Sequence, residues 1–178
     1  MGKKQIQKEL YPQRSGFTLV EILVVVIILA LAMYAAVPMF SGAAEMRLQS
    51  AANMVAADIE YAKSMAISRQ QQYGLIFYPD TESYKVVDQN SNEIPHPVKL
   101  GFNYNFDFTK DSRLSQVDLV SADFSDGTST SHTVKFDYLG SPYIGSGGAM
   151  NSGTITLQAG GVTATIIIEP VTGYIRIQ

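Results

Sequence analysis

A continuous apolar segment over residues 17–37 contains a single formal charge, the carboxylate of Glu21. Twenty-one residues at about 1.5 Å each give roughly 32 Å of helix, enough to cross a hydrocarbon core of about 30 Å. A carboxylate in such a helix costs about 2–3 kcal/mol at mid-bilayer and less near an end. Two interpretations follow: Glu21 is an interfacial carboxylate with no further role, or it awaits a positive partner such as the α-amino group of a neighbouring chain.

Residues 1–16 form a basic, polar leader in front of this segment. The leader holds one acidic residue and four basic ones: Lys3, Lys4, Lys8 and Arg14. An ordinary secretory signal is cut after its apolar region, beside small residues. Here the small residue, Gly16, comes before that region. A cut between Gly16 and Phe17 would remove the leader, keep the helix and create the amine that Glu21 lacks.

The sequence Gly16-Phe17-Thr18-Leu19-Val20-Glu21 resembles the cleavage and methylation motif of type IV prepilins and type II secretion pseudopilins. The resemblance implies that a membrane prepilin peptidase cuts between Gly16 and Phe17 and methylates the new N-terminus at Phe17. It also implies that Glu21 pairs with the N-terminal amine of an adjacent subunit during assembly. Pro38 falls where such proteins often carry a helix-kinking proline, and a proline does bend a helix that continues past it.

Composition excludes several classes of function. Removal of the leader changes the formal charge from −3 to −6, leaving 9 basic and 15 acidic residues, which argues against non-specific nucleic-acid binding. The absence of cysteine excludes a disulfide framework, a thiolate metal site and a cysteine nucleophile. Basic residues before the apolar helix predict a cytoplasmic N-terminus and an exported, periplasmic C-terminal domain.

Beyond Pro38 the pattern becomes that of an amphipathic helix that continues to about Arg69. Its apolar residues recur every three or four positions: Ala44, Leu48, Ala51, Val55, Ile59, Ala62 and Ala66. The polar residues fall largely elsewhere, and Glu60 with Lys63 is spaced for a weak ion pair. We expect the small side chains of this stripe to pack against a sheet.

The remainder reads as β-structure. A hairpin is expected from residues 73–78 and 84–88, and a second from residues 154–158 and 162–168 joined through Ala159-Gly160-Gly161. Further strands are expected over 132–138 and 174–177, and less regular ones near 98–108 and 117–121. Residues 125–132 and 140–148 are expected to be exposed connections. The predicted class is α+β, a long N-terminal helix packed on an antiparallel sheet.

Two features beyond the apolar segment resemble the minor pseudopilins of the H type and the related minor pilins of the T type. These are the helix end Asp58–Ile67 and the strands that close with Pro170-Val171-Thr172-Gly173-Tyr174-Ile175-Arg176-Ile177. Lys63 stands where such proteins often have arginine. The resemblance divides the chain into a leader (1–16), a long helix (17–69, with its transmembrane half at 17–37) and a β-rich head (70–178).

Residues with catalytic or metal-binding side chains form no recognisable motif. The two histidines, His96 and His132, have no clustered partner, and no nucleophile elbow, P-loop or zinc-protease motif occurs. Carboxylates that could supply oxygen ligands lack EF-hand spacing: Asp118, Asp123, Asp126 and Asp137. We therefore expect no catalytic residue, no cofactor and no metal.

Three functions are weighed. The first is a structural subunit of a type II secretion pseudopilus, and the second is a minor type IV pilin in pilus assembly, adhesion or DNA uptake. The third, a membrane-anchored enzyme, lacks a convergent polar site. The resemblance implies three kinds of partner: a prepilin peptidase, other pilin or pseudopilin subunits, and an inner-membrane assembly platform.

Overall fold

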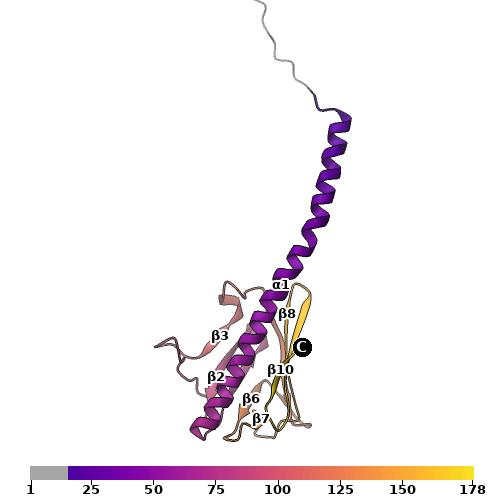
Figure 1. Cartoon of the computed structure of the whole chain (residues 1–178). Helices are drawn as coiled ribbons and strands as arrows, with labels where there is room; N and C mark the ends of the chain where they lie inside the picture. The colour runs from indigo at the N-terminus through magenta and orange to yellow at the C-terminus, as the bar shows by residue number, and fades with distance from the viewer. Residues whose placement is uncertain (1–15) are drawn as a thin grey trace, which may run out of the picture. The chain divides into compact units, whose positions relative to one another are not determined.

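The computed structural model describes residues 16–178, with the side chains of 34–41 excepted. The chain divides into two compact units, Met1–Met39 and Phe40–Gln178, and helix α1 (Leu19–Arg69) contributes to both (Figure 1). Most of the predicted leader, residues 1–15, lies outside the described residues. The side chain of Pro38 does so too.

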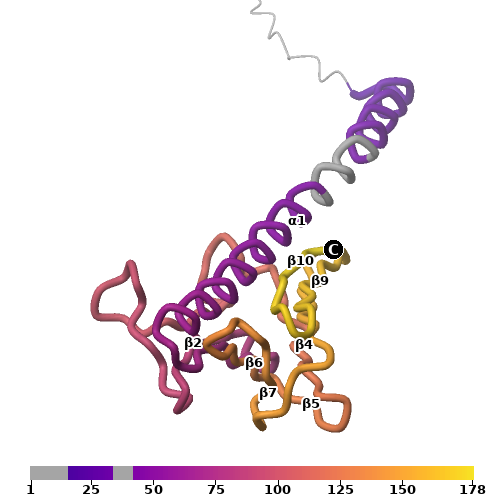
Figure 2. Tube along the Cα trace, turned by 60° about the horizontal axis from the view of Figure 1, so that its bottom comes forward, coloured from indigo at the N-terminus to yellow at the C-terminus, as the bar shows by residue number. Residues whose placement is uncertain are grey.

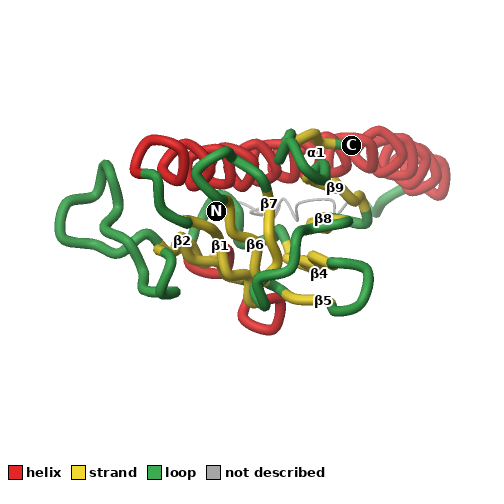
Figure 3. Tube along the Cα trace, turned by 90° about the horizontal axis from the view of Figure 1, so that it is seen from below, coloured by secondary structure: helices red, strands yellow, loops and turns green. Residues whose placement is uncertain are grey.

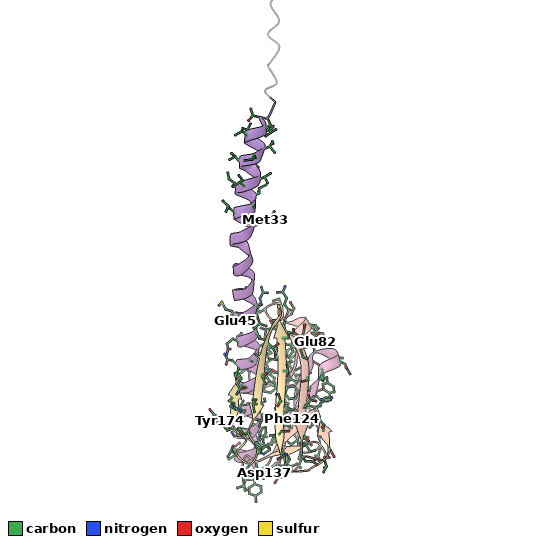
Figure 4. The ribbon with its side chains drawn as sticks, turned by 90° about the vertical axis from the view of Figure 1, so that its right-hand side faces the viewer. Met33, Glu45, Glu82, Phe124, Asp137 and Tyr174 are labelled. Carbon is green, nitrogen blue, oxygen red and sulfur yellow. The ribbon has the colours of Figure 1, made fainter. Side chains whose placement is uncertain are left out.

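In the first unit the helical side chains face outward. From Phe17 to Met33 the side chains are exposed, including Val24, Ile27 and Leu29 (Figure 4). Among the described residues no helix is apolar over a length that would cross a membrane. The segment predicted to span one, residues 17–37, includes four positions whose side chains are not described.

In the second unit one side of α1 is buried. Leu48, Val55 and Ile59 lie in the core, and the alanines of the same stripe are fully covered: Ala51, Ala52, Ala62 and Ala66. Alanine lets the helix axis approach the strands closely, because its side chain ends at Cβ. The strands lie on one side of this part of α1 (Figures 2 and 3).

The first sheet has the strand order β3-β2-β1-β6-β7, and its paired strands are antiparallel. Its strands are β1 (Tyr73–Tyr78), β2 (Ser83–Asp88), β3 (Asn105–Asp107), β6 (Thr133–Phe136) and β7 (Pro142–Ile144). A single 3-10 turn, η1 (Pro79–Thr81), joins β1 to β2, and a second, η2 (Phe108–Lys110), follows β3. The predicted hairpin 73–88 is confirmed.

The second sheet has the order β10-β9-β8-β4-β5. Its strands are β4 (Asp118–Ser125), β5 (Thr130–Ser131), β8 (Ser152–Ala159), β9 (Val162–Ile168) and β10 (Ile175–Ile177). β8 and β9 pair from Gly153–Ile168 to Ala159–Val162, as the predicted hairpin requires. Gly160 and Gly161 have φ of 54° and 81°, the left-handed region that a tight turn of this kind needs.

Three strand predictions are wrong in part. Of residues 98–108, only Asn105–Asp107 form a strand. The connection predicted over 140–148 contains β7, and the one over 125–132 contains β5. Pro95 and Pro97 lack the N–H that a ladder needs, and Gly101 turns the chain at φ 83°, so residues 95–103 leave the sheet. The α+β class with a helix on antiparallel sheet is confirmed, with the strands divided between two sheets.

Candidate processing and assembly site

Helix α1 begins at a threonine cap. The backbone N–H of Glu21 donates to Thr18 Oγ1 at 3.2 Å, and the N–H of Ile22 donates to the Thr18 carbonyl at the same distance. Thr18 is therefore the N-cap, and Glu21 occupies the third helical position, as in a capping box. The signal was present in the sequence as Thr-x-x-Glu, but the sequence reasoning did not use it. The cap fixes where the helix starts relative to the predicted cleavage site.

Gly16 and Phe17 precede the cap in non-helical backbone. A Cβ built on Gly16 meets no atom within 4 Å, and the Phe17 side chain is 76% exposed. Nothing in the described part of the fold therefore requires glycine at position 16. If a small residue is needed there, the need comes from whatever binds this peptide bond.

Glu21 is exposed in the first turn of α1. A carboxylate there interacts favourably with the partial positive charge of the helix N-terminus, by about 0.3–1 kcal/mol. An α-amino group at Phe17 would introduce a full positive charge at this same end, where the dipole disfavours it. The amine at the start of the helix can therefore attract the carboxylate of another chain, and Glu21 can attract another chain's amine.

The head contains a half-buried carboxylate that the sequence patterns did not indicate. Asp58 of α1 accepts hydrogen bonds from the hydroxyls of Tyr84 at 2.6 Å and Tyr104 at 2.7 Å. Burial raises the pKa of Asp58, while the two tyrosine hydroxyls and nearby His96 act in the opposite direction. Burial, together with the hydrogen bond to Asp58, raises the pKa of Tyr104 well above its ordinary value. A polar residue beside the stripe residues Val55 and Ile59 was the signal available in the sequence.

The candidate histidines make contacts with the nearby backbone. His96 Nδ1 accepts the N–H groups of Val98 and Lys99, each at 3.1 Å, and His132 Nδ1 lies 2.6 Å from the Ala122 carbonyl.

Two of the aspartates hold turns. Asp126 accepts the N–H groups of Thr128 and Ser129, and Asp137 accepts those of Leu139 and Ser141. Over the described residues no group of three or more His, Asp or Glu side chains is placed to hold a metal.

Comparisons with known proteins give two sequence matches. Residues 51–172 match the family described as type II transport protein GspH, and residues 12–37 match the prokaryotic N-terminal methylation motif. The second match contains Gly16, Phe17 and Glu21. None of the curated proteins matches the sequence.

Two solved structures are similar in fold. The minor pseudopilin EpsH of the type 2 secretion system of Vibrio cholerae has a TM-score of 0.51 at 11% identity, covering 74% of this chain and 96% of EpsH. The type IV minor pilin FimU of Pseudomonas aeruginosa has a TM-score of 0.46 at 17% identity, covering 75% of this chain and 88% of FimU.

Proposed function

The chain belongs to the family of type II transport protein GspH, and from that premise we propose how this minor pseudopilin of the type II secretion system matures and assembles. Prepilin peptidase cuts between Gly16 and Phe17, removes the leader 1–16 and methylates the amine of Phe17. The processed chain joins a pseudopilus through residues 17–37, while residues 70–178 remain outside the membrane as the head.

The observation that carries this proposal is the start of α1. Thr18 begins the helix one residue after Phe17, and both Gly16 and Phe17 are exposed in non-helical backbone. A protease needs an accessible, non-helical peptide bond, and the Gly16–Phe17 bond meets both conditions. The methylation-motif match covers the same residues.

Assembly follows from charge and burial. In lipid, the exposed apolar side chains of residues 19–33 lie in favourable, apolar surroundings. The Glu21 carboxylate, by contrast, is desolvated at a cost of about 2–3 kcal/mol. Packing of one helix against another exchanges lipid contacts for helix contacts at little net cost. A neighbouring Phe17 amine beside Glu21 then neutralises both charges, and this pairing gives the contact its register.

The proposed topology and partners follow from the same segment. The basic leader places the N-terminus in the cytoplasm and the head in the periplasm, with the helix in the inner membrane. The partners are the prepilin peptidase, other pseudopilin subunits and the assembly platform of the inner membrane. We propose a structural role without catalysis, and the GspH match favours secretion over the alternative of a minor type IV pilin.

Intact-mass measurement tests the cleavage directly. The full chain is co-produced with a prepilin peptidase, and the mass is expected to fall by that of residues 1–16 and to gain one methyl group. Gly16→Ala is the matched control, because it adds a single methyl group and is expected to be cut in part. Gly16→Phe is expected to remain uncut, although the fold leaves room for it.

An unchanged wild-type mass would overturn the proposed processing. Cutting of Gly16→Phe at the wild-type rate would show that the peptidase does not read this position.

A further inference from the structure

Residues 94–104, between β2 and β3, form a hairpin that projects from the head (Figure 3). Backbone hydrogen bonds pair the two sides of its base, and the outermost of them joins the N–H of His96 to the Phe102 carbonyl at 2.8 Å. Residues 97–101 lie beyond this bond and are here called the tip. The tip therefore depends on contacts of its own to keep one conformation.

The side chain of His96 closes the tip. Its Nδ1 atom accepts the backbone N–H groups of Val98 and Lys99, each at 3.1 Å. A residue before a proline is restricted to extended backbone, so Pro97 helps to hold His96 in the conformation from which its ring reaches both donors. The N–H of Phe102 adds a longer bond to the Lys99 carbonyl, at 3.2 Å. Two hydrogen bonds of the tip thus depend on one ring nitrogen.

This geometry fixes the tautomer of His96. An atom that accepts two N–H groups carries no hydrogen of its own, so the proton of the neutral ring lies on Nε2. His132 has the opposite arrangement, because its Nδ1 lies 2.6 Å from the Ala122 carbonyl, which can only accept. Protonation of the imidazole therefore removes the acceptor at His96 and leaves the hydrogen bond of His132 intact.

The groups around the His96 ring decide what moves when it is protonated. From across the hairpin the Tyr104 ring lies 4.5 Å away, centroid to centroid, and the charge of Asp58 in α1 acts on the histidine. Lys99 is the charged residue of the turn itself. An imidazolium is attracted to an aromatic face and to a carboxylate. The charged ring thus stays beside Tyr104, which Asp58 holds by its hydroxyl at 2.7 Å, and the tip is the part that is released.

We propose that His96 is a pH-sensitive switch for the tip: the neutral ring holds residues 97–101 closed, and protonation of Nδ1 releases them while the base of the hairpin stays paired. Histidine is the side chain that ordinarily changes charge between about pH 5 and pH 8, so the switch operates near neutral pH. The inference concerns the head alone and does not depend on cleavage of the leader.

The switch acts on exposed apolar side chains. Val98 and Leu100 in the tip are 82% and 89% exposed, and Phe102 beside them is 68% exposed. While the tip is closed, these side chains have fixed positions, so a binding partner would not have to offset the entropy of ordering them. Release of the tip adds that entropy to the cost of any binding here. The pH therefore controls whether this apolar surface is presented in an ordered form.

Nuclear magnetic resonance of the full chain in detergent tests the tautomers, with an affinity tag that contains no histidine. The sequence has two histidines, so isotope labelling of the imidazole nitrogens gives one set of ring signals for His96 and one for His132. At about pH 8 the nitrogen shifts are expected to report a hydrogen on Nε2 of His96 and on Nδ1 of His132.

Hydrogen exchange at the Val98 amide tests the release of the tip. Labelling the carbonyl of proline and the nitrogen of valine isolates this amide, because Pro-Val occurs only at residues 97–98 and 170–171. From about pH 8 to about pH 5, protection of the Val98 amide relative to its intrinsic rate is expected to fall about fivefold, as loss of one hydrogen bond does. The midpoint is expected to equal that of the His96 ring signals. Val171, in an exposed turn, is the internal control and is expected to keep constant protection.

Substitutions separate the ring from its surroundings. His96→Asn supplies a side-chain carbonyl that accepts an N–H two residues on and does not titrate, so Val98 protection is expected to stay high at every pH. His96→Phe keeps an aromatic ring beside Tyr104 without an acceptor, and it is expected to show the low protection throughout. His132→Asn is the matched control and is expected to keep the wild-type transition.

A hydrogen on Nδ1 of the neutral His96 ring would overturn the proposal. Constant Val98 protection through the titration of that ring would do the same. A transition that persists in His96→Asn would also contradict the switch, and would assign the pH dependence of the tip to Asp58.

Discussion

Helix α1 contains two regions of opposite character, residues 19–33 and residues 42–69. In the first, apolar side chains are exposed all around the helix; in the second, one side is a buried apolar stripe in which many of the residues are alanine. The head-side region finds its packing partner within the chain, in the two sheets. Within the described residues the side chains of the N-terminal region are exposed, so lipid or other helices can cover them. A helix that is apolar all round is typical of such surroundings.

Matched isoleucine truncations give the largest contrast between the two regions. Ile59 is completely buried under the sheets, whereas Ile27 is 50% exposed. Ile59→Ala is expected to lower the free energy of unfolding of the head by about 2–5 kcal/mol, because it removes buried contacts and leaves a cavity. Ile27→Ala is expected to leave it unchanged. Thermal unfolding of the full chain in detergent, followed by tyrosine circular dichroism, measures both.

Equal losses of stability in the two variants would contradict the comparison. They would mean that the two regions of α1 contribute in the same way to one folded core.

Glu21→Ala tests the N-terminal region by itself. The variant is expected to be cleaved and to keep the thermal stability of the head, but to lose about thirtyfold or more in co-purification with partner subunits. The loss follows from the 2–3 kcal/mol at stake when a carboxylate and an amine are matched in an apolar surrounding. Glu45→Ala is the control, because Glu45 is an exposed acid of the same helix.

Full co-purification of Glu21→Ala would support the other interpretation of this residue, an interfacial carboxylate that contributes through the helix cap and the dipole alone. Loss of co-purification by Glu45→Ala as well would point to the net acidity of the helix.

Lys63 tests how the head holds its C-terminal turn against α1. Its ammonium donates to the Gly173 carbonyl at 2.9 Å and lies 3.3 Å from Glu60, the ion pair that the sequence predicted. Lys63→Met keeps most of the packing stem and is expected to cost about 1 kcal/mol through the unpaired carbonyl. Lys63→Arg is the matched control and is expected to cost less. A loss above about 3 kcal/mol in Lys63→Met would show that the stem, not the hydrogen bond, is responsible.

What the sequence predicted depended on how local the signal was. The hairpin through Gly160 and Gly161 and the stripe around Val55 are read from neighbouring residues, and the structure has both. Val98, Leu100 and Phe102 alternate as a strand does, but they lie outside the sheet, next to Tyr104, which contacts distant Asp58 and Tyr61. The same limit applies to Asp58, because no local pattern indicates that Tyr84 and Tyr104 will reach it. The N-terminal motif is local throughout and was found entirely from sequence.

The smallest predicted effect is the pH dependence set by Asp58. Burial raises its pKa in the folded head above the ordinary value of 3.8, so the folded state binds this proton more tightly than the unfolded state does. The contribution of this group to stability is therefore full below pH 3.8 and is lost as the pH rises through the raised pKa. Asp88 and Asp107 oppose it, because hydrogen bonds and nearby lysines lower their pKa values, and their contribution is lost as the pH falls.

Asp58→Asn removes the first of these contributions and keeps one oxygen to accept a tyrosine hydroxyl. Above pH 3.8, the stability of the variant relative to wild type is expected to rise with pH. Asp107→Asn should show the reverse trend as the pH falls through 3.8, which makes it the matched control. Melting temperatures of the full chain between about pH 3 and pH 7 measure the two slopes. Parallel curves for wild type and Asp58→Asn would show that Asp58 keeps an ordinary pKa, and that Tyr104 is held without a desolvated carboxylate.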